Sequence, residues 1–527
     1  MRRALLVALA LLATTLPGAA PVPAAAAAHS CPAGLAAWRQ LTGAAWLDCH
    51  RLADLTTTGN PYTDPGSLTG MGFPPPGSGT LNSHYTHPTT PAVAGLQIDG
   101  YWPDGCNAFQ AEPAAVAKDG TPFIPGCTPT PGAGDCISGC HHDGQFVIRI
   151  PDSWNGHLLT AGTPGIRDAF SSDFIFSDYA VEKGWAYVSQ DKGNLAANFY
   201  RDGSDEVACA TSWCPAVAIR EWTPRMRQAT KAARSLLNSV APGYGLRRVT
   251  YSYATGISNG GYQARRALET DTAGPRLYDG GVDWEGTLFT TRSNLFRYLP
   301  TAVYYGPAAI ARYPAAIQQL AAVGFNPESQ PLWGYHYSVY WGLTQKVYRL
   351  EMDPEYTGYT CSDPLGAGPP CVSPAAEVVP PADPDATYNF AARLQALPAL
   401  GSRMQSIANT GNIQHPLITL HGDQDSLLPI KTDSVIYEQM VADAGKSSSF
   451  RFYIVRGGNH VDPQFDDHYG VDNYGNTLLR PMLPCVRVAL DAMATWVEAG
   501  TSPPASHTIA RPNPATADEL ANSCSLS

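Results

Sequence analysis

The segment YSYATGISNGGYQARR, residues 251–266, places Ser258 between two glycines where a strand pattern gives way to a helix pattern. A serine on so sharp a turn needs neighbours without side chains, so that the strand and the helix can approach each other. We therefore predict that Gly256 and Gly260 flank a tight turn that exposes the Ser258 hydroxyl. The pattern alone is weak in a chain with 49 glycines, and the alternative is a glycine-rich turn with an incidental serine.

Strand-like and helix-like segments alternate on both sides of this turn. Short apolar runs predict strands at 96–103, 146–151, 157–162, 184–191 and 247–254, and the sheet is expected to resume with strands within 416–425 and 450–460. Apolar residues at helical spacing predict helices over 223–240, 259–269 and 485–500. Thr223 is the expected cap of the first helix, with Pro224 at its first position, and Gly500 is the expected end of the last. This alternation favours a mostly parallel sheet with helices on both faces.

The second half of the chain supplies the two partners that a serine nucleophile needs. His460 follows the apolar run RFYIV and two glycines, and Asp425 follows LITLHG. A histidine can take the hydroxyl proton, and an ionised carboxylate can orient the imidazole. The order Ser258, Asp425, His460 is that of the α/β-hydrolases. Two alternatives stay open: Asp423 as the acid, and His460 as a surface loop histidine.

An oxyanion formed at Ser258 needs backbone donors. We expect one to be the amide of Asn259, directly after the nucleophile. The other should come from GTPGIR, the loop after the strand at 157–162. Pro164 has no amide hydrogen, so Thr163 and Gly165 are the candidates. The alternative is an ordinary strand-to-helix loop.

Five stretches resemble a known family. The stretches are WNGHLLTAGTPG, GISNGG, HGDQDSLLP, GGNH and WVEAGTSPP, and the resemblance spans roughly residues 95–500. They are similar to the secreted α/β-hydrolase esterases, and within them to the tannase and feruloyl esterase group and the 3-hydroxybutyrate oligomer hydrolases. The resemblance implies an α/β-hydrolase fold and a serine carboxylic-ester hydrolase with Ser258 as nucleophile, Asp425 as acid and His460 as base.

One departure from the family separates two substrate classes. Tannases and fungal-type feruloyl esterases carry bridged cysteines directly before the serine and beside the histidine, whereas this chain has Ile257 and Asn459 there. The SNGG stretch looks more like the hydrolases of short polyesters. We therefore expect oligomeric hydroxyalkanoate esters as substrates. Aromatic plant esters, amide bonds cleaved by a peptidase or amidase, and a non-catalytic binding module are the alternatives.

The chain begins with two arginines, an apolar run and an alanine-rich segment, which indicates a secretory signal peptide and an extracellular protein. A stretch rich in Cys, Gly and Pro follows, and aromatic, helix-like pieces later interrupt the core. We predict the following division: signal peptide 1–28, N-terminal extension with an early strand 29–145, core 146–285, inserted and largely helical cap 286–405, core 406–500, tail 501–527.

The composition bears on partners and cofactors. The net charge of −11, with no run of Lys and Arg, argues against nucleic acid. No later apolar run is long enough to span a membrane. The reaction needs no cofactor or metal, and the oligomeric state is not readable. The twelve cysteines fit six disulfides between sequence neighbours, the last pairing Cys485 with Cys524.

Further alternatives concern metals and aromatic residues. Cys136, Cys140, His141 and His142 would suit zinc, although a disulfide beside exposed histidines is favoured. Acidic residues near 462–467 would suit calcium, although a solvated loop is favoured. Cap aromatics are expected mainly in the cap core, with a substrate groove as the alternative: Tyr304, Tyr305, Trp333, Tyr335, Tyr337, Tyr340 and Trp341.

Overall fold

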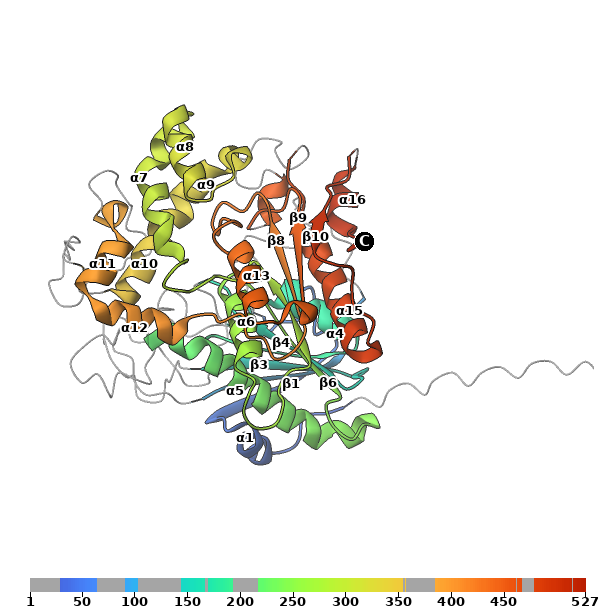
Figure 1. Cartoon of the computed structure of the whole chain (residues 1–527). Helices are drawn as coiled ribbons and strands as arrows, with labels where there is room; N and C mark the ends of the chain where they lie inside the picture. Colours follow the sequence, from blue (N-terminus) through green and yellow to red (C-terminus); the bar gives the residue numbers. More distant parts are fainter. Residues whose placement is uncertain are drawn as a thin grey trace, which may run out of the picture.

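A computed structural model of the chain describes residues 29–63, 91–102, 144–165, 169–192, 217–353, 356, 384–460, 462–466, 478–513 and 515–527. Within these ranges the strands form one ten-stranded sheet in the order β1-β2-β3-β5-β4-β6-β7-β8-β9-β10. Figure 1 shows this sheet with helices around it. The strands are β1 (Trp46–Leu52), β2 (Gly95–Tyr101), β3 (Gln145–Pro151), β4 (His157–Gly162), β5 (Ala186–Gln190), β6 (Tyr251–Ile257), β7 (Gly280–Trp284), β8 (Leu417–Gly422), β9 (Phe450–Val455) and β10 (His507–Ile509).

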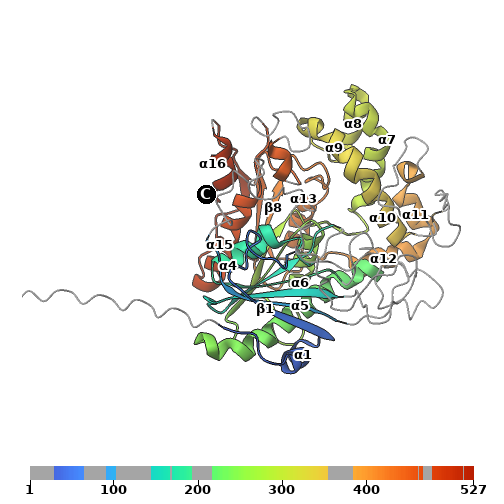
Figure 2. The same cartoon turned by 180° about the vertical axis from the view of Figure 1, so that it is seen from behind.

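The sheet is parallel from β5 to β10 and antiparallel at its other edge. β1, β2 and β3 pair antiparallel, and β3 pairs antiparallel with β5. Figure 2 shows β1, drawn in blue, with α1 (Ala36–Thr42) close to it. The chain runs from β4 outward to β5 and then returns to β6 on the other side of β4. This reversal of strand order is the place where open α/β sheets build their sites, beyond the carboxyl ends of the strands.

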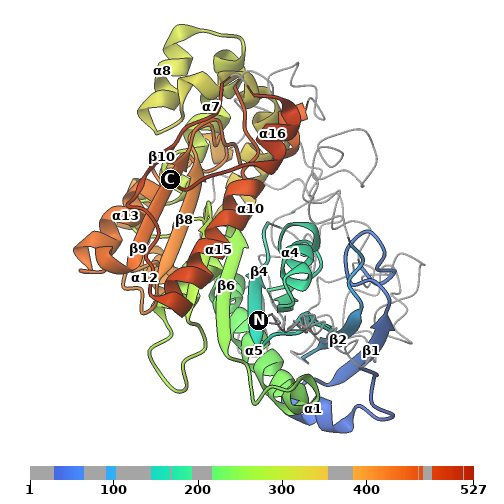
Figure 3. The same ribbon diagram turned by 90° about the vertical axis from the view of Figure 1, so that its right-hand side faces the viewer.

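Helices cover both faces of the sheet, as the alternating sequence predicts. Leu158 and Leu159 are adjacent on β4 and both fully buried, yet they belong to different cores because neighbouring strand residues point to opposite faces. Leu158 packs with α5 (Val217–Val240). Leu159 packs with α4 (Asp178–Glu182) and α15 (Leu483–Ala499), and Figure 3 shows α15 crossing in front of the sheet.

The remaining helices fall into two groups. α6 (Asn259–Glu269) and α13 (Ser434–Asp443) follow β6 and β8, and α16 (Ala517–Asn522) lies near the C-terminus. The second group lies between β7 and β8 and stands beside the sheet, on the left of Figure 1. It contains α7 (Leu299–Ile310), α8 (Pro314–Ala322), α9 (Trp333–His336), α10 (Gly342–Met352), α11 (Phe390–Ala396) and α12 (Pro398–Ile407). We call these six helices, together with the described residues between them, the cap.

The start of the first predicted helix is wrong. α5 begins at Val217, so Thr223 is not its cap and Pro224 lies inside it. Proline removes one hydrogen bond of the helix, but Ile219 and Trp222 are almost completely buried in the apolar cluster of the cap. Their burial stabilises the two added turns, since tertiary packing supplies most of the stability of a helix.

Two disulfides fall within the described residues, and both join the predicted neighbours: Cys31 with Cys49, and Cys485 with Cys524. The second ties the C-terminal segment to α15. The signal peptide, the other eight cysteines, His141 and His142 lie outside the described residues. The division into domains stays a prediction.

The observed sheet and helices confirm the predicted fold class, an α/β-hydrolase fold with a disulfide near the N-terminus. Among the described helices, none has the length and apolar character that crossing a membrane requires.

Candidate active site

Ser258 occupies the single residue between β6 and α6. Its backbone has φ 58° and ψ −121°, a conformation that residues with a side chain rarely adopt. The surroundings hold it there: its N–H donates to the Trp284 carbonyl at 3.0 Å, and its own carbonyl accepts from Thr287 N at 3.1 Å. Strain of this kind persists where neighbouring structure over-determines it, and it concentrates at functional sites.

The glycines around Ser258 allow three backbone segments to touch. A Cβ atom at Gly256 would lie 2.3 Å from the carbonyl oxygen of Gly260, and one at Gly260 would lie 2.2 Å from the carbonyl oxygen of Gly162. Real Cβ contacts are never so short, so side chains are excluded at these positions. The predicted flanking glycines therefore bring β6, α6 and the end of β4 together around the serine.

Asp425 and His460 are brought together. His460 Nδ1 lies 2.9 Å from Asp425 Oδ2, and both side chains are buried. Asp425 Oδ1 accepts from the amides of Leu427 and Leu428 at 2.7 and 2.9 Å, and Oδ2 also contacts His421 Nε2 at 3.1 Å. These contacts fix the orientation of the carboxylate and, through it, of the imidazole.

The electrostatics of this pair suit an acid and a base. Burial acts to raise the pKa of Asp425, but the charge of His460 and hydrogen bonds from His421 and His460 hold it well below its ordinary value. Burial acts to lower the pKa of His460, but the charge of Asp425 and its hydrogen bond raise it well above the ordinary value. Asp425 therefore stays ionised and favours a protonated imidazole.

Asp423, the alternative acid, has other partners. Its carboxylate accepts from Arg456 Nη1 at 2.6 Å and from the amide of Gly457 at 2.8 Å. The carboxylate that is hydrogen bonded to His460 is that of Asp425.

The structure places Ser258 and His460 at the same edge of the sheet, at the ends of β6 and β9. Within the described part of the chain no hydrogen bond joins the two side chains. The link between them runs through β7: Trp284 accepts from Ser258 N, and the next residue, Glu285, lies 3.4 Å from His460 Nδ1.

Two of the three candidate oxyanion donors, Asn259 and Thr163, lie beside the serine turn. Asn259 begins α6, so its N–H has no acceptor within the helix. The loop after β4 reaches the same place, because a Cβ atom at Gly260 would lie 3.2 Å from Thr163 N. The Thr163 hydroxyl donates to the Gln190 carbonyl, and the backbone carbonyl of Thr163 accepts from the side chain of Gln263. Gly165 has φ 39° and nothing within 4 Å of a Cβ position. The geometry places Thr163 N near the serine turn.

Glu285 is a site residue that the sequence analysis missed. It follows β7 directly, has φ 50°, and is fully buried. Its Oε1 accepts from the amide of Gly422 at 2.7 Å. Burial and the negative charge of Asp425 raise the pKa of Glu285 to about 7. One signal in the sequence could have identified Glu285: it directly follows VDW (residues 282–284), the end of the next strand in the chain after the strand that carries Ser258.

The cap contacts the loops at this edge of the sheet. Tyr348 on α10 donates to Asn259 Oδ1, which also accepts from the Thr287 hydroxyl at 3.2 Å. Trp341 donates its indole N–H to the Ser426 carbonyl at 2.7 Å, and Asn326 donates to the Asp423 carbonyl at 2.8 Å. The cap therefore touches both the serine turn and the loop of the acid.

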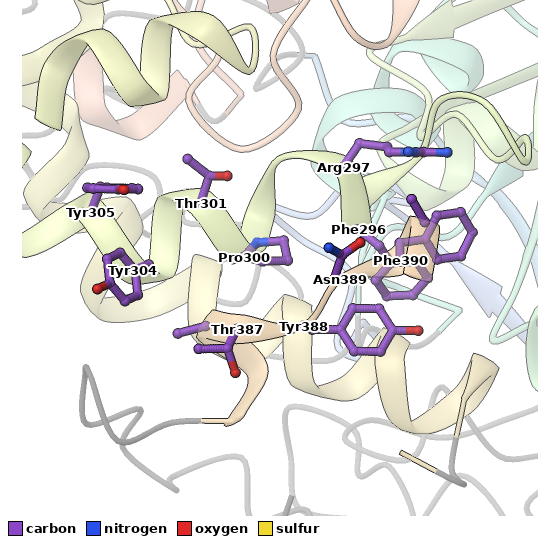
Figure 4. Close-up of a pocket in the computed structure, with 12 residues that line it drawn as sticks. Phe296, Arg297, Pro300, Thr301, Tyr304, Tyr305, Thr387, Tyr388, Asn389 and Phe390 are labelled. Carbon is purple, nitrogen blue, oxygen red and sulfur yellow. The ribbon is translucent and has the colours of Figure 1, made fainter. Parts of the chain in front are cut away.

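The cap aromatics divide into a core and a surface group. Trp333 and Trp341 are completely buried in the apolar cluster of the cap. Tyr304 and Tyr305 instead line a surface pocket of about 390 Å³ between α7 and residues 386–391, shown in Figure 4. This pocket contains none of Ser258, Asp425 and His460.

Two groups of residues could be considered for metal binding. Glu285, Asp425 and His460 offer ligand atoms within 4.8 Å of one another, but the hydrogen bonds given above already engage Asp425 and His460 with each other. Asp462 accepts from the amides of Met482 and Leu483 at 2.7 and 3.0 Å, so it caps the start of α15. Asp467, like the cysteine and histidine cluster at 136–142, lies outside the described residues.

No protein-family model and no curated protein matches the chain. Solved structures to which it is similar include three esterases. Feruloyl esterase B from Aspergillus oryzae is 16% identical, with 87% of this chain and 88% of that chain covered and a TM-score of 0.44. Tannin acyl hydrolase from Aspergillus niger is 13% identical, with 87% and 83% covered and a TM-score of 0.41. The rice cell wall degrading esterase LipA from Xanthomonas oryzae is 12% identical, with 85% and 97% covered and a TM-score of 0.41.

These names agree with the group that the sequence motifs resemble, the tannases, feruloyl esterases and related esterases. At such identities and scores the likenesses carry no argument about activity, which must come from the site.

Proposed function

We propose that the chain is a serine carboxylic-ester hydrolase that works through an acyl-enzyme. The observation that carries this proposal is the backbone of Ser258, which has φ 58° at the single position between β6 and α6, beside close backbone contacts that exclude any side chain at Gly256 and Gly260. A strained serine at the carboxyl end of a central parallel strand is the presentation that this chemistry requires. The buried pair of Asp425 and His460 at the same edge supports it.

The reaction runs in two halves. Ser258 Oγ attacks the ester carbonyl carbon while His460 takes the hydroxyl proton, and Asp425 stabilises the imidazolium. The oxyanion accepts from the amide of Asn259 and from a second donor, Thr163 or Gly165. The bond to the alcohol then breaks, and the alcohol leaves with the proton from His460. Water enters, gives a proton to His460, attacks the acyl carbon, and the acid leaves as Ser258 regains its proton.

The substrate class that we favour is an oligomeric hydroxyalkanoate ester of the 3-hydroxybutyrate type. The support is the SNGG stretch and the replacement of two cysteines. Ile257 is buried in the core, and buried Asn459 donates to Gln464, where tannases and fungal-type feruloyl esterases have a disulfide. An aromatic ester of the tannase or feruloyl type is the second candidate. A peptidase or amidase and a silent binding module are the remaining alternatives.

The N-terminal pattern and the two disulfides support export to an extracellular, oxidising environment. The division into signal peptide, N-terminal extension, two core segments, cap and tail belongs to the same proposal. The cap between residues 286 and 405 would shape the acyl or alcohol pocket over the serine.

Hydrolysis of p-nitrophenyl butyrate by the wild type and by Ser258→Ala tests the chemistry. We expect activity in the wild type, none above background in the variant, and a fluorophosphonate label on the peptide that contains Ser258. Activity retained by Ser258→Ala would refute the nucleophile. A panel of hydroxybutyrate oligomers, gallates, feruloyl esters and amides then ranks the substrate classes.

A further inference from the structure

The further inference concerns Glu285 and the imidazole of His460. Glu285 is held at the end of β7 by two hydrogen bonds of its own: its N–H donates to the Leu420 carbonyl at 2.9 Å, and its Oε1 accepts from Gly422 N at 2.7 Å. The next amide, that of Gly286, donates to Asp283 at 2.8 Å. The remaining oxygen, Oε2, is buried, and within the described residues it makes no hydrogen bond. It lies 3.4 Å from His460 Nδ1.

Two carboxylates therefore face one ring nitrogen. Asp425 Oδ2 lies 2.9 Å from His460 Nδ1 and Glu285 Oε2 lies 3.4 Å from it. A single N–H makes one linear hydrogen bond, so Asp425 is the first partner and Glu285 the second. The two carboxylates also repel each other, since their ligand atoms and that of the histidine all lie within 4.8 Å.

The other titratable groups around Glu285 come from four parts of the structure. β8 and the turn after it contribute His421 and Asp425, and the loop after β9 contributes His460. On β7 itself, Asp283 is paired with Arg265 at 2.5 Å. From the cap, His336 faces Asp425 and His460, and burial lowers its pKa to about 3, so it is neutral. The titrations of Glu285 and His460 are therefore coupled to each other beside an ionised Asp425.

We propose that Glu285 is a positioning residue for the catalytic base: a second carboxyl partner of His460 that supports the imidazolium together with Asp425 and takes over when Asp425 is neutralised. This inference rests on the proposed function. Glu285 touches neither substrate nor Ser258 in this role and acts only through His460. No bond is made or broken by Glu285, which changes only the proton affinity and orientation of the imidazole.

The first test is the pH profile of kcat/KM on p-nitrophenyl butyrate for Glu285→Gln. The acid limb reports protonation of the base in the free enzyme. Removing a negative charge beside the imidazole lowers its proton affinity, so we expect the limb to move to lower pH by about 1. Glu285→Asp keeps the charge and should move the limb back toward the wild type. Glu498→Gln, which changes a carboxylate that contacts His157 and Tyr253, is the matched control.

The second test combines Glu285→Gln with Asp425→Asn. Loss of the acid in a triad that has one carboxylate lowers kcat about 10⁴-fold. We expect Asp425→Asn to lose less than that here, and Glu285→Gln to cost at least about tenfold more in the Asp425→Asn background than in the wild type. The comparison of Asp425→Asn with the wild type stands even if Glu285→Gln does not fold.

The outcomes separate this inference from the proposed function. The role of Glu285 is overturned if the acid limb does not move and Glu285→Gln lowers activity by the same factor in the wild type and in Asp425→Asn. This conclusion holds even when the wild type is active and Ser258 takes the fluorophosphonate label. A lower melting temperature with no change of the limb identifies a merely structural role and also overturns it. A wild type with neither label nor activity overturns both proposals together.

Discussion

Gly260 and Gly162 meet backbone to backbone: a Cβ atom on Gly260 would lie 2.2 Å from the carbonyl oxygen of Gly162, and one on Gly162 would lie 2.5 Å from the carbonyl oxygen of Gly260. This contact joins the first turn of α6, which follows the candidate nucleophile, to the end of β4, directly before the loop that carries the candidate second oxyanion donors, Thr163 and Gly165. The close approach of α6 to β4 therefore requires glycine at both 162 and 260.

Gly260→Ala should abolish fluorophosphonate labelling of Ser258 and lower the melting temperature, because α6 must move away from β4 to admit the methyl group. Gly401→Ala on α12 is the matched control. The nearest atom to its Cβ position lies 3.8 Å away, and alanine in a helix is favoured over glycine by about 0.5 to 1 kcal/mol. Full labelling of Gly260→Ala would contradict the close packing.

Tyr348→Phe should lower kcat/KM several-fold. The hydroxyl of Tyr348 holds the side chain of Asn259 from the cap, and a hydrogen bond of this kind contributes about 1 kcal/mol. The loss should appear in steady-state kinetics without a large change in melting temperature. Tyr304→Phe, at a cap tyrosine that is 45% exposed, should behave as the wild type. An equal effect of the two substitutions would argue against a link between the cap and the serine turn.

Asp178→Asn should make stability less dependent on pH. Burial raises the pKa of Asp178 to about 8 although Thr57 donates two hydrogen bonds to it. The folded state then holds a proton that the unfolded state releases near pH 4, so this group lowers stability as pH rises from about 4 to about 8. Unfolding in urea at pH 5 and pH 8 measures the effect. The free energy of unfolding of the variant, relative to that of the wild type, should be higher at pH 8 than at pH 5. The exposed Asp443→Asn should show no such difference.

Replacing Cys485 and Cys524 together by serine should destabilise the protein by about 2 to 4 kcal/mol. The disulfide closes a separation of 39 residues, and Leu520 and Leu526 near it belong to the core on the α15 face. Esterase activity at 25 °C should remain, because the bond touches none of the site residues. Inactivation of the folded variant at that temperature would show that the C-terminal segment positions the site.

Particular elements show where sequence reasoning succeeds. The strands at 146–151 and 157–162 and the helix at 259–269 are strongly patterned, and the structure has them with shifts of at most about one residue at an end. Within 450–460 only the apolar part is a strand, β9 (Phe450–Val455). The pairing of Asp425 with His460 also followed from position, since both residues come shortly after strands that end at the same edge. The roles of these residues in catalysis stay predictions.

Other parts could not be predicted because their signal is weak or lies far away in the chain. β7 has the sequence GGVDW, which contains no apolar run that would predict a strand. Its extended conformation depends on hydrogen bonds to β6 on one side and β8 on the other. Glu285 was missed with it, since its meaning depends on that strand. The early start of α5 depends on Ile219 and Trp222 packing against the cap, a contact across a long sequence separation.

β7 and β8 are neighbours joined by hydrogen bonds, although the six cap helices lie between them in the sequence. The insertion therefore begins after one strand and ends before the strand that is hydrogen bonded to it. Under the proposed function, a chimera that exchanges only the insertion and keeps the hydrogen bond from Tyr348 to Asn259 tests whether substrate preference lies in this stretch.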